Sequence, residues 1–319
     1  MANVNGGERG QLVLLTAVAI AALLVLVAVL LSSLVYTENV ATRDDSGADA
    51  RAAQLHRIAA IDAVEGLTER ANRDGTSYEA FRESVAAWES QQAQHAATTG
   101  ASATVTVRST TNGTRIGQTN ASYTLTNASG VGSWTLVSGA TAVEGWTLTV
   151  NESSLVTPTS TANATTLAES GAFHVVATNG TVTRQAFLYR ESGDVVLHVD
   201  SGAGALEPPC VATPDGNGTV TVDISARTVE STDCAALGLL DSWSGSFAIA
   251  HSNGENATGT YSLVVDRPID EVDDGDVTTG GGGTPFAAPH TADVRIDVTY
   301  TTADLRYRVW NVPVEEDAP

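Results

Sequence analysis

Residues 103–109 have the sequence ATVTVRS, in which apolar and polar side chains alternate. This period of two is typical of a β-strand with one buried face, because successive side chains point to opposite faces of a sheet. Similar runs, separated by Gly, Asn, Ser and Asp, cover residues 133–138, 145–151, 172–178, 181–190, 194–200, 219–225, 260–266, 293–301 and 305–312. We therefore expect a mainly antiparallel, sandwich-like β domain over residues 101–319, as one large sandwich or two small ones.

Two turns and one long loop punctuate this β-rich part. Asn179-Gly180 lies between two alternating runs, which is a strong hairpin signal. A final turn near Ala303 and Asp304 joins the last two runs. Residues 267–290, RPIDEVDDGDVTTGGGGTPFAAPH, are acidic and rich in glycine, and we expect a flexible loop there.

Two helices are expected before the β-rich part, forming a helical neck over residues 47–98. The first covers residues 48–73, with Leu55, Ile58, Ile61, Val64 and Leu67 at every third position, a spacing that winds around a helix. Gly75 then suits a left-handed cap, and Thr76 with Glu79 has the spacing of a capping box. The next helix carries an apolar stripe, which either docks on the β domain or binds a partner protein. The stripe residues are Tyr78, Phe81, Val85 and Trp88.

An uncharged apolar run extends over residues 12–31. At 1.5 Å per residue its length is about 30 Å, the thickness of a bilayer core. The run is too long for the apolar region of a cleavable signal, so we expect a leader at 1–10 and a transmembrane helix with its stem at 11–46. A stripe of small residues on this helix would let another helix approach closely. The stripe residues are Ala17, Ala21, Ala28 and Ser32.

The composition is strongly acidic. The chain has 319 residues with a net charge of −21, and all 16 basic residues are arginine. This bias is typical of proteins that stay soluble in very high salt, and a GC-rich genome would also replace lysine by arginine. Such a charge excludes nucleic acid as a partner, because nothing would neutralise a row of phosphates.

Asn-x-Ser/Thr triplets are frequent after residue 100. Of fourteen asparagines, eight lie in such sequons, and none of the four before residue 100 does. We expect candidate glycosylation sites on an extracellular domain, with the N-terminus cytoplasmic. The alternative is that Thr-rich turns generate these triplets. The eight are Asn112, Asn120, Asn127, Asn151, Asn163, Asn179, Asn217 and Asn256.

The two cysteines, Cys210 and Cys234, are expected to form a disulfide, with two buried thiols as the alternative. A closed loop of that length would stabilise the fold by roughly 3–4 kcal/mol. Their spacing does not suit a metal site.

Other candidate chemistry is weak. The acidic residues from Asp270 to Asp276 lack the ligand pattern of an EF-hand, with Val272 and Gly281 at two ligand positions, so a solvated loop is favoured over a weak cation site. His174 and His198 lie on expected strands and could meet across a sheet, but no zinc motif is present. No nucleophile elbow, Walker loop or dinucleotide fingerprint occurs. We expect a non-enzymatic protein without a cofactor.

The residues Arg9-Gly10-Gln11 before the apolar run resemble the signal that archaeal prepilin peptidases cut, between Gly10 and Gln11. The wider stretch RGQLVLL…YTENVATR resembles a group of haloarchaeal, pilin-like membrane proteins of unknown function. The fifth residue after the cut would be Leu15, where major type IV pilins commonly carry glutamate, so the resemblance implies a minor or pseudopilin-like role.

These observations predict an α+β fold: one N-terminal transmembrane helix, a helical neck and a β-sandwich-like extracellular domain. The expected function is that of a membrane-anchored, pilin-like or pseudopilin-like surface protein that assembles through its N-terminal helix. Its partners would be membrane lipid and other pilin-like subunits or envelope proteins. The alternative is an anchored adhesion or binding module that does not polymerise.

Overall fold

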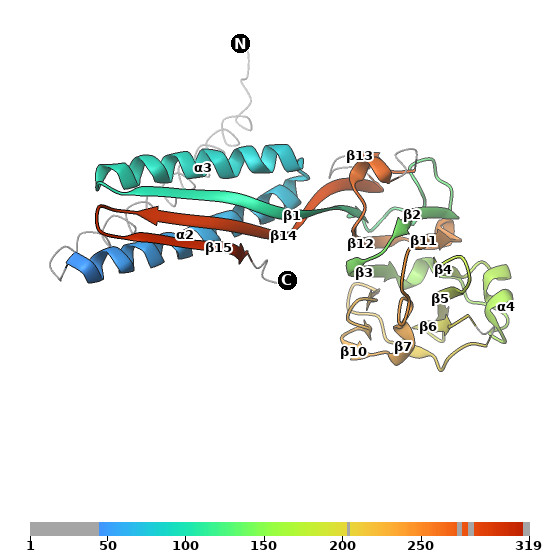
Figure 1. The fold of residues 1–319 in the computed structure, drawn as a ribbon. Coiled ribbons are helices and arrows are strands. Elements are labelled where there is room, and N and C mark those ends of the chain that lie inside the picture. The colour runs from blue at the N-terminus through green and yellow to red at the C-terminus, as the bar shows by residue number, and fades with distance from the viewer. Residues whose placement is uncertain (1–44, 203–204, 273–275, 280–283, 315–319) are drawn as a thin grey trace, which may run out of the picture.

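The computed structural model describes residues 45–314 except 203–204, 273–275 and 280–283. The molecule is elongated and has two lobes joined by two long strands (Figure 1). We call residues 45–113 and 289–314 the helix-covered lobe, and residues 114–288 the β lobe. The β lobe is therefore inserted in the chain between the two strands that link it to the helix-covered lobe.

The strands form two sheets. The first has nine strands in the order β10-β9-β8-β3-β12-β1-β14-β13, with β15 also paired to β14, and the second has the order β2-β11-β4-β5-β6-β7. All pairs are antiparallel except β13 with β14. The strands of the first sheet are β1 (Ser102–Gln118), β3 (Val143–Asn151), β8 (Thr219–Asp223), β9 (Thr228–Val229), β10 (Thr232–Asp233), β12 (Gly259–Val265), β13 (Thr278–Thr279), β14 (Phe286–Thr301) and β15 (Arg306–Pro313). Those of the second are β2 (Trp134–Ala140), β4 (Phe173–Thr178), β5 (Thr183–Glu191), β6 (Asp194–Asp200), β7 (Cys210–Ala212) and β11 (Phe247–Ser252).

The long strands β1 and β14 pair with each other through both lobes. Register shifts between Val107 and Thr111 mark where the pair leaves the helix-covered lobe, as bulges bend and twist a strand. Beyond this point β1 also pairs with β12. Gly113 and Gly117 lie where these backbones come close: a Cβ atom would stand 2.4 Å from the Val265 oxygen or 2.7 Å from the Tyr261 oxygen.

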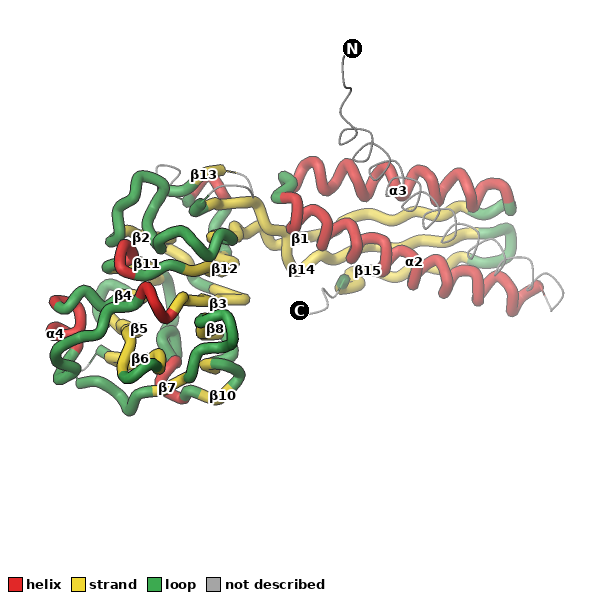
Figure 2. The backbone as a smooth tube through the Cα atoms, turned by 180° about the vertical axis from the view of Figure 1, so that it is seen from behind, coloured by secondary structure: helices red, strands yellow, loops and turns green. Residues whose placement is uncertain are grey.

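Helices α2 (Asp45–Asp74) and α3 (Tyr78–Thr98) cover one face of the sheet formed by β1, β14 and β15 (Figure 2). The stripe on α3 docks there as predicted: Phe81 and Val85 are buried with Val105, Ile296 and Val298 of the strands. Tyr78 and Trp88 are partly buried against the same cluster.

Helix α2 packs through small residues and through part of the predicted stripe, since Val64 is buried and Ile61 and Leu67 are partly buried against the same cluster. Its buried residues include Ala53, Ala60, Val64 and Ala71, whereas Leu55 and Ile58 are 45% and 53% exposed. Positions 53, 60, 64 and 71 lie on one face of a helix with 3.6 residues per turn. Residues at every third position instead wind around such a helix. Small side chains let the helix lie close to the strands.

The junction between α2 and α3 is close to the expected one. Gly75 has a φ of +63°, as the predicted left-handed cap requires. The capping residue is Ser77, one residue after the expected Thr76, and its Oγ accepts the Ala80 N–H at 3.4 Å.

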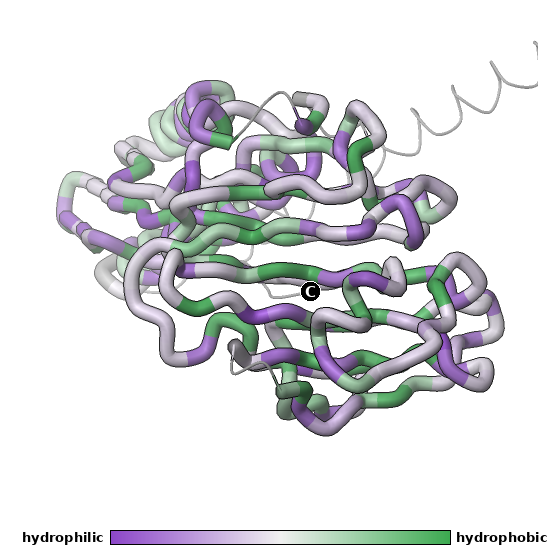
Figure 3. Tube along the Cα trace, turned by 90° about the vertical axis from the view of Figure 1, so that its right-hand side faces the viewer, coloured by the Kyte–Doolittle hydropathy of each residue, from purple (hydrophilic) through white to green (hydrophobic). Residues whose placement is uncertain are grey.

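The β lobe is a sandwich of the second sheet and the inserted part of the first. Its core joins Leu148, Val220 and Val222 of the first sheet to Leu188 and Leu197 of the second. Hydrophobic stretches of the chain are interrupted by hydrophilic residues in this part of the molecule (Figure 3). A short helix, α4 (Ala164–Glu169), and four 3₁₀ turns, η1 (Glu152–Ser154), η2 (Ala235–Leu237), η3 (Gly254–Asn256) and η4 (Ile269–Glu271), lie in the connections.

The ten alternating runs all lie on strands, and the hairpins at Asn179-Gly180 and between β14 and β15 are confirmed. The predicted range of the flexible loop, 267–290, is longer than the irregular segment in the structure. Residues 286–290 belong to β14, with Phe286, Ala287 and Ala288 buried, and η4 and β13 lie before them.

The predicted fold class is wrong. The described residues are mostly β-sheet in two sheets, and residues 47–98 are no neck, because α2 and α3 pack along the strands. Within the described part of the chain, no helix is long and apolar enough to cross a membrane. The leader at 1–10, the expected membrane helix at 11–46 and its stripe of Ala17, Ala21, Ala28 and Ser32 lie outside the described residues. The described residues therefore do not support the prediction of a single-pass membrane protein with a cytoplasmic N-terminus and an extracellular domain.

Candidate functional site

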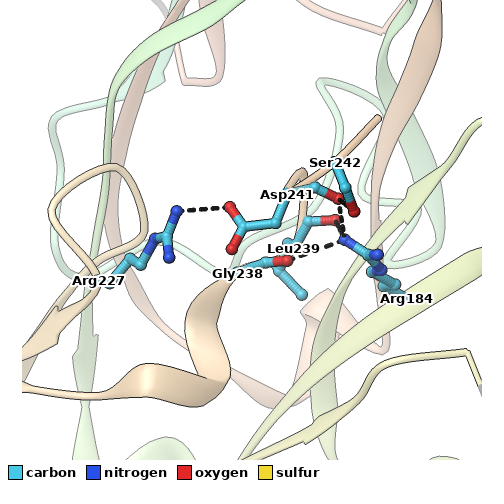
Figure 4. A network of polar contacts seen from close by, with 6 residues as sticks. All are labelled: Arg184, Arg227, Gly238, Leu239, Asp241 and Ser242. Carbon is cyan, nitrogen blue, oxygen red and sulfur yellow. Dashed lines mark hydrogen bonds and ion pairs between the residues drawn. The ribbon is translucent and has the colours of Figure 1, made fainter. Parts of the chain in front are cut away.

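One loop of the β lobe, residues 234–243, is held by an unusual set of contacts (Figure 4). Arg184 of β5 reaches into it, and its Nη1 donates to the carbonyl oxygens of Gly238, Leu239 and Asp241 at 2.9, 3.1 and 2.9 Å. The guanidinium also stacks on the Trp243 ring, 5.0 Å from its centre. A single guanidinium nitrogen thus contacts three carbonyl groups of one short stretch of backbone, residues 238–241, and its two N–H groups are shared among them.

Covalent and ionic contacts hold the same loop from its other side. Cys234 is bonded to Cys210 of β7, which confirms the predicted disulfide. Arg227 Nη2 lies 2.5 Å from Asp241 Oδ1, and both side chains are about half exposed. Leu237 and Leu239 are 1% exposed and point into the sandwich core. The loop therefore closes one end of the sandwich with a defined shape.

A cavity of about 190 Å³ lies beside this loop. Its walls are mostly apolar, and the Arg227–Asp241 ion pair is part of its lining. The lining residues are Val143, Trp146, Ile224, Ser225, Arg227, Leu237, Leu239, Leu240 and Asp241.

Trp146 is the feature that sets this cavity apart. Its side chain is 1% exposed, and its Nε1 donor has no hydrogen-bond partner among the described residues. A buried N–H without a partner costs about 1–3 kcal/mol, so nearly all such groups in native proteins are paired. The Ser225 Oγ nearby accepts the Trp146 backbone N–H at 2.9 Å. Trp146 therefore lines the cavity with a side chain whose Nε1 is unpartnered among the described residues and is itself shielded from solvent.

The two histidines that could meet across a sheet, His174 and His198, are kept apart. His174 and His198 lie in the same row of the sheet, but Phe187 of β5 stands between them and pairs with both. The His174 Nδ1 lies 3.0 Å from the Ala172 oxygen, and the His198 Nδ1 lies 2.9 Å from the Tyr189 hydroxyl. Across the described residues, no group of three or more His, Cys, Asp or Glu side chains could hold a metal ion.

The sequons have structural roles in turns. Four of their asparagines accept the backbone N–H two residues later at 3.0–3.1 Å, which makes an Asx turn. These are Asn120, Asn127, Asn151 and Asn179. Asn163 caps α4 by accepting the Thr166 N–H at 2.9 Å. This pattern favours the alternative in which turn chemistry generates the triplets.

The asparagines of the sequons also differ in how accessible their side chains are. Asn127 is buried and its Nδ2 donates to Asp276 Oδ1 at 2.5 Å, while Asn256 Nδ2 donates to the Gly171 oxygen at 2.9 Å. Asn112, Asn120, Asn163 and Asn217 are exposed.

A second cavity, of about 320 Å³, lies where the two lobes meet. Its lining residues are Glu69, Asn72, Arg73, Arg115 and His290. Asn72 joins α2 to β14 here: its Nδ2 donates to the Thr291 oxygen at 2.9 Å, and its Oδ1 accepts the Thr291 N–H at 2.7 Å. The side-chain amide thus pairs with the backbone as a neighbouring strand would.

The comparison with known proteins covers the first part of the chain. Residues 6–126 match a family of unknown function, DUF7261. The match extends over 121 of 319 residues and includes α2, α3 and β1, so the chain is similar to this family in less than half of its length. No curated protein matches the chain. The residues Arg9, Gly10 and Gln11 of the expected processing signal lie inside the matched stretch but outside the described residues.

Proposed function

We propose that this chain is a non-enzymatic binding protein whose β lobe takes a small, uncharged group in the cavity beside Trp146. The observation that carries the proposal is the buried Nε1 donor of Trp146, which has no partner among the described residues and belongs to a side chain that lines a cavity of about 190 Å³. Once the indole turns its Nε1 into the cavity, an acceptor oxygen of a ligand would satisfy that donor, and the apolar part of the ligand would contact Val143, Ile224 and Leu240.

The size of the cavity narrows the ligand class. Pockets for complete small molecules are typically about 300–1,000 Å³. The cavity beside Trp146 is smaller, so its occupant is one terminal group of a larger molecule, such as one neutral sugar ring or one apolar amino-acid side chain with its carbonyl. The ion pair of Arg227 and Asp241 would contact the polar rim of that group.

A binding role agrees with the chemistry of the lining better than catalysis does. A nucleophile needs a base within hydrogen-bond reach, and the base needs a third group to orient it. The one hydroxyl in the lining, Ser225, already accepts a backbone N–H, and no histidine lines the cavity. The carboxylate in the lining, Asp241, is paired with an arginine.

The test follows the indole N–H resonances in ¹H–¹⁵N spectra of the intact protein. The probes are a series of neutral monosaccharides and N-acetyl amino-acid amides, added one at a time. We expect one class of probe to shift the Trp146 signal but not that of Trp134, whose Nε1 already donates to the Leu125 oxygen at 3.2 Å. Leu240→Trp, which fills the cavity, should abolish the shift. A Trp146 signal that no probe moves would contradict the proposal.

A second function, assembly as a pilin-like subunit, is favoured by a separate observation. Helix α2 exposes Leu55 and Ile58 directly after the segment that carries the apolar run, and the family match spans both. Exposed apolar residues on a helix suit contact with another helix. A mature protein that begins at Gln11, measured by mass spectrometry of its N-terminal peptide, would support this function. An intact Met1 or Ala2 start would count against it.

A further inference from the structure

The three-stranded sheet of the helix-covered lobe has one face that no other described element covers, which we call the open face. The helices bury Val105, Ile296 and Val298 on the other side, so the alternate residues of β1, β14 and β15 point away from them. This face is turned to the viewer in Figure 1. Between its charged residues it carries serine and threonine, including Thr104 and Thr299, which are paired across the strands.

The open face is basic although the chain is acidic. Arg108, Arg295, Arg306 and Arg308 lie on it together with Asp297, and Asp293 is exposed two residues before Arg295. The Asp297 carboxylate already has two partners on the same sheet: its Oδ2 lies 3.2 Å from Arg108 Nη1, and its Oδ1 accepts the Asn311 N–H at 2.8 Å. Arg306 and Arg308 are exposed and form no ion pair with a described carboxylate.

An exposed tryptophan completes this surface. Trp310 is 55% exposed, and the Arg308 guanidinium lies over its ring at 4.6 Å from the centre. Arginine and tryptophan are the residues most enriched at the centres of protein interfaces. The edge of β15 itself is protected against strand addition, because it carries two arginines, Pro313 and a left-handed residue, Asn311. The face rather than the edge is therefore the contact surface.

The opposite end of the same nine-stranded sheet is acidic. Strand β10 is the last strand at that end, while β15 lies at the other. Asp223 lies on β8, Glu230 in the turn between β9 and β10, and Asp233 on β10, and the last two are exposed. The one arginine of this end, Arg227 between β8 and β9, is paired with Asp241. The β lobe as a whole has 19 acidic residues against 5 arginines, a net charge of −14, whereas the helix-covered lobe has 12 against 9.

We propose that the open face of one copy binds the acidic β8–β10 end of a second copy. The contact joins two different surfaces, so it is heterologous and repeats as an open chain of subunits rather than closing into a dimer. A head-to-tail arrangement also keeps the two acidic lobes apart. At 0.1 M salt the repulsion between the acidic lobes of neighbouring copies is screened beyond about 10 Å. The arginines and carboxylates that face each other across the contact are closer than that, so their attraction remains.

Sedimentation velocity of the intact chain at 0.1 M and 1 M NaCl tests this proposal. We expect concentration-dependent association at 0.1 M that weakens at 1 M. Arg306→Glu with Arg308→Glu should weaken it about tenfold or more, and Trp310→Ala should also weaken it. The control is Arg51→Glu with Arg57→Glu, which makes the same charge change at exposed positions of α2.

Mixing two variants identifies the contact. The second variant is Glu230→Arg with Asp233→Arg, which should also lose association by itself. Mixed with the Arg306→Glu, Arg308→Glu variant, it should associate again, because each supplies the surface that the other has lost. The proposal would be overturned by a monomeric wild-type chain, by an unchanged association constant in either variant, or by a mixture of the variants that does not associate. Association lost equally in the α2 control would do the same.

Discussion

The two lobes differ in how their strands are covered and in where their charge lies. In the helix-covered lobe, α2 and α3 pack on one face of three strands, and no other element in the described part of the chain covers the opposite face. In the β lobe, two sheets bury their inner faces against each other. The net charge follows the same division, −3 in the helix-covered lobe and −14 in the β lobe.

This difference shows that the net charge of −21 is not spread evenly over the molecule. Acidic side chains concentrate on the lobe that carries the candidate cavity, and the lobe next to it keeps a basic face. Strands β1 and β14 run through both lobes, so the lobes share backbone pairing but not a core. The following experiments ask how independent they are.

The largest effect is expected from Phe81→Ala in α3. Phe81 is 1% exposed in the cluster between the helices and the sheet, and such a truncation typically costs roughly 3–5 kcal/mol of unfolding free energy. Hydrogen exchange should accelerate for amides of α3 and β15, while those of β5 and β11 stay protected. Equal acceleration in both lobes would show that they unfold as one unit. Leu55→Ala, at an exposed position of α2, is the control and should change stability by less than about 0.5 kcal/mol.

The converse experiment removes the disulfide with Cys210→Ala and Cys234→Ala. The two cysteines are 24 residues apart, and a loop of that size is worth about 3 kcal/mol through the entropy of the unfolded chain. The loss should appear in urea unfolding of the β lobe. Amides of α3 should keep their exchange rates, and a loss of protection there would contradict separate lobes.

The strands could be predicted from the sequence because their signal is local. Most of the ten runs have apolar residues on one face, and pairing in a sheet preserves that pattern, whereas β5 and β6 bury residues on both faces. The second half of β1 gives no such signal: it contains Asn112-Gly113, which is typical of a turn. There the strand is imposed by pairing with β14 on one side and β12 on the other. The insertion of one lobe between two strands depends on these distant contacts.

The candidate site could be predicted only in part. The disulfide followed from the cysteine count, since two cysteines allow one pairing. The capture of three carbonyl groups by Arg184 has no local pattern, because β5 and the loop are about 50 residues apart in the chain. The unpartnered donor of Trp146 depends on the packing at the end of the sandwich. No sequence spacing encodes it.

The junction between the lobes provides a smaller effect. Asn72→Ala removes the two hydrogen bonds that join α2 to Thr291 and leaves both backbone groups of Thr291 without their side-chain partner. We expect a loss of about 2 kcal/mol, because water in the adjacent cavity can replace part of the pairing. Differential scanning calorimetry measures it. Arg73→Ala, at the neighbouring exposed residue of the same cavity, is the control, and an equal loss there would remove the special role of Asn72.

The last effect, similar in size to that of Asn72, concerns acid and the β lobe alone. His251 is buried among Trp134, Phe173 and Tyr261, with ring centres 5.9, 5.2 and 4.9 Å away. Burial lowers its pKa to about 3, so the folded protein holds the ring neutral, while the unfolded chain takes up a proton below its ordinary pKa of 6.5. Stability should therefore fall as the pH decreases from 6.5 towards 3. At pH 5 this residue alone should account for about 2 kcal/mol.

His251→Phe removes that part of the acid sensitivity and keeps an aromatic ring in the cluster. We expect the difference in unfolding free energy between pH 7.5 and pH 5 to shrink by about 2 kcal/mol in urea titrations. Tyr261→Phe is the matched control in the same cluster, because burial raises the pKa of the Tyr261 hydroxyl and moves it further from this pH range. The His251 assignment is wrong if both variants keep the wild-type pH dependence. A change confined to the β lobe would add a second property, beside charge, in which the two lobes respond separately to the solvent.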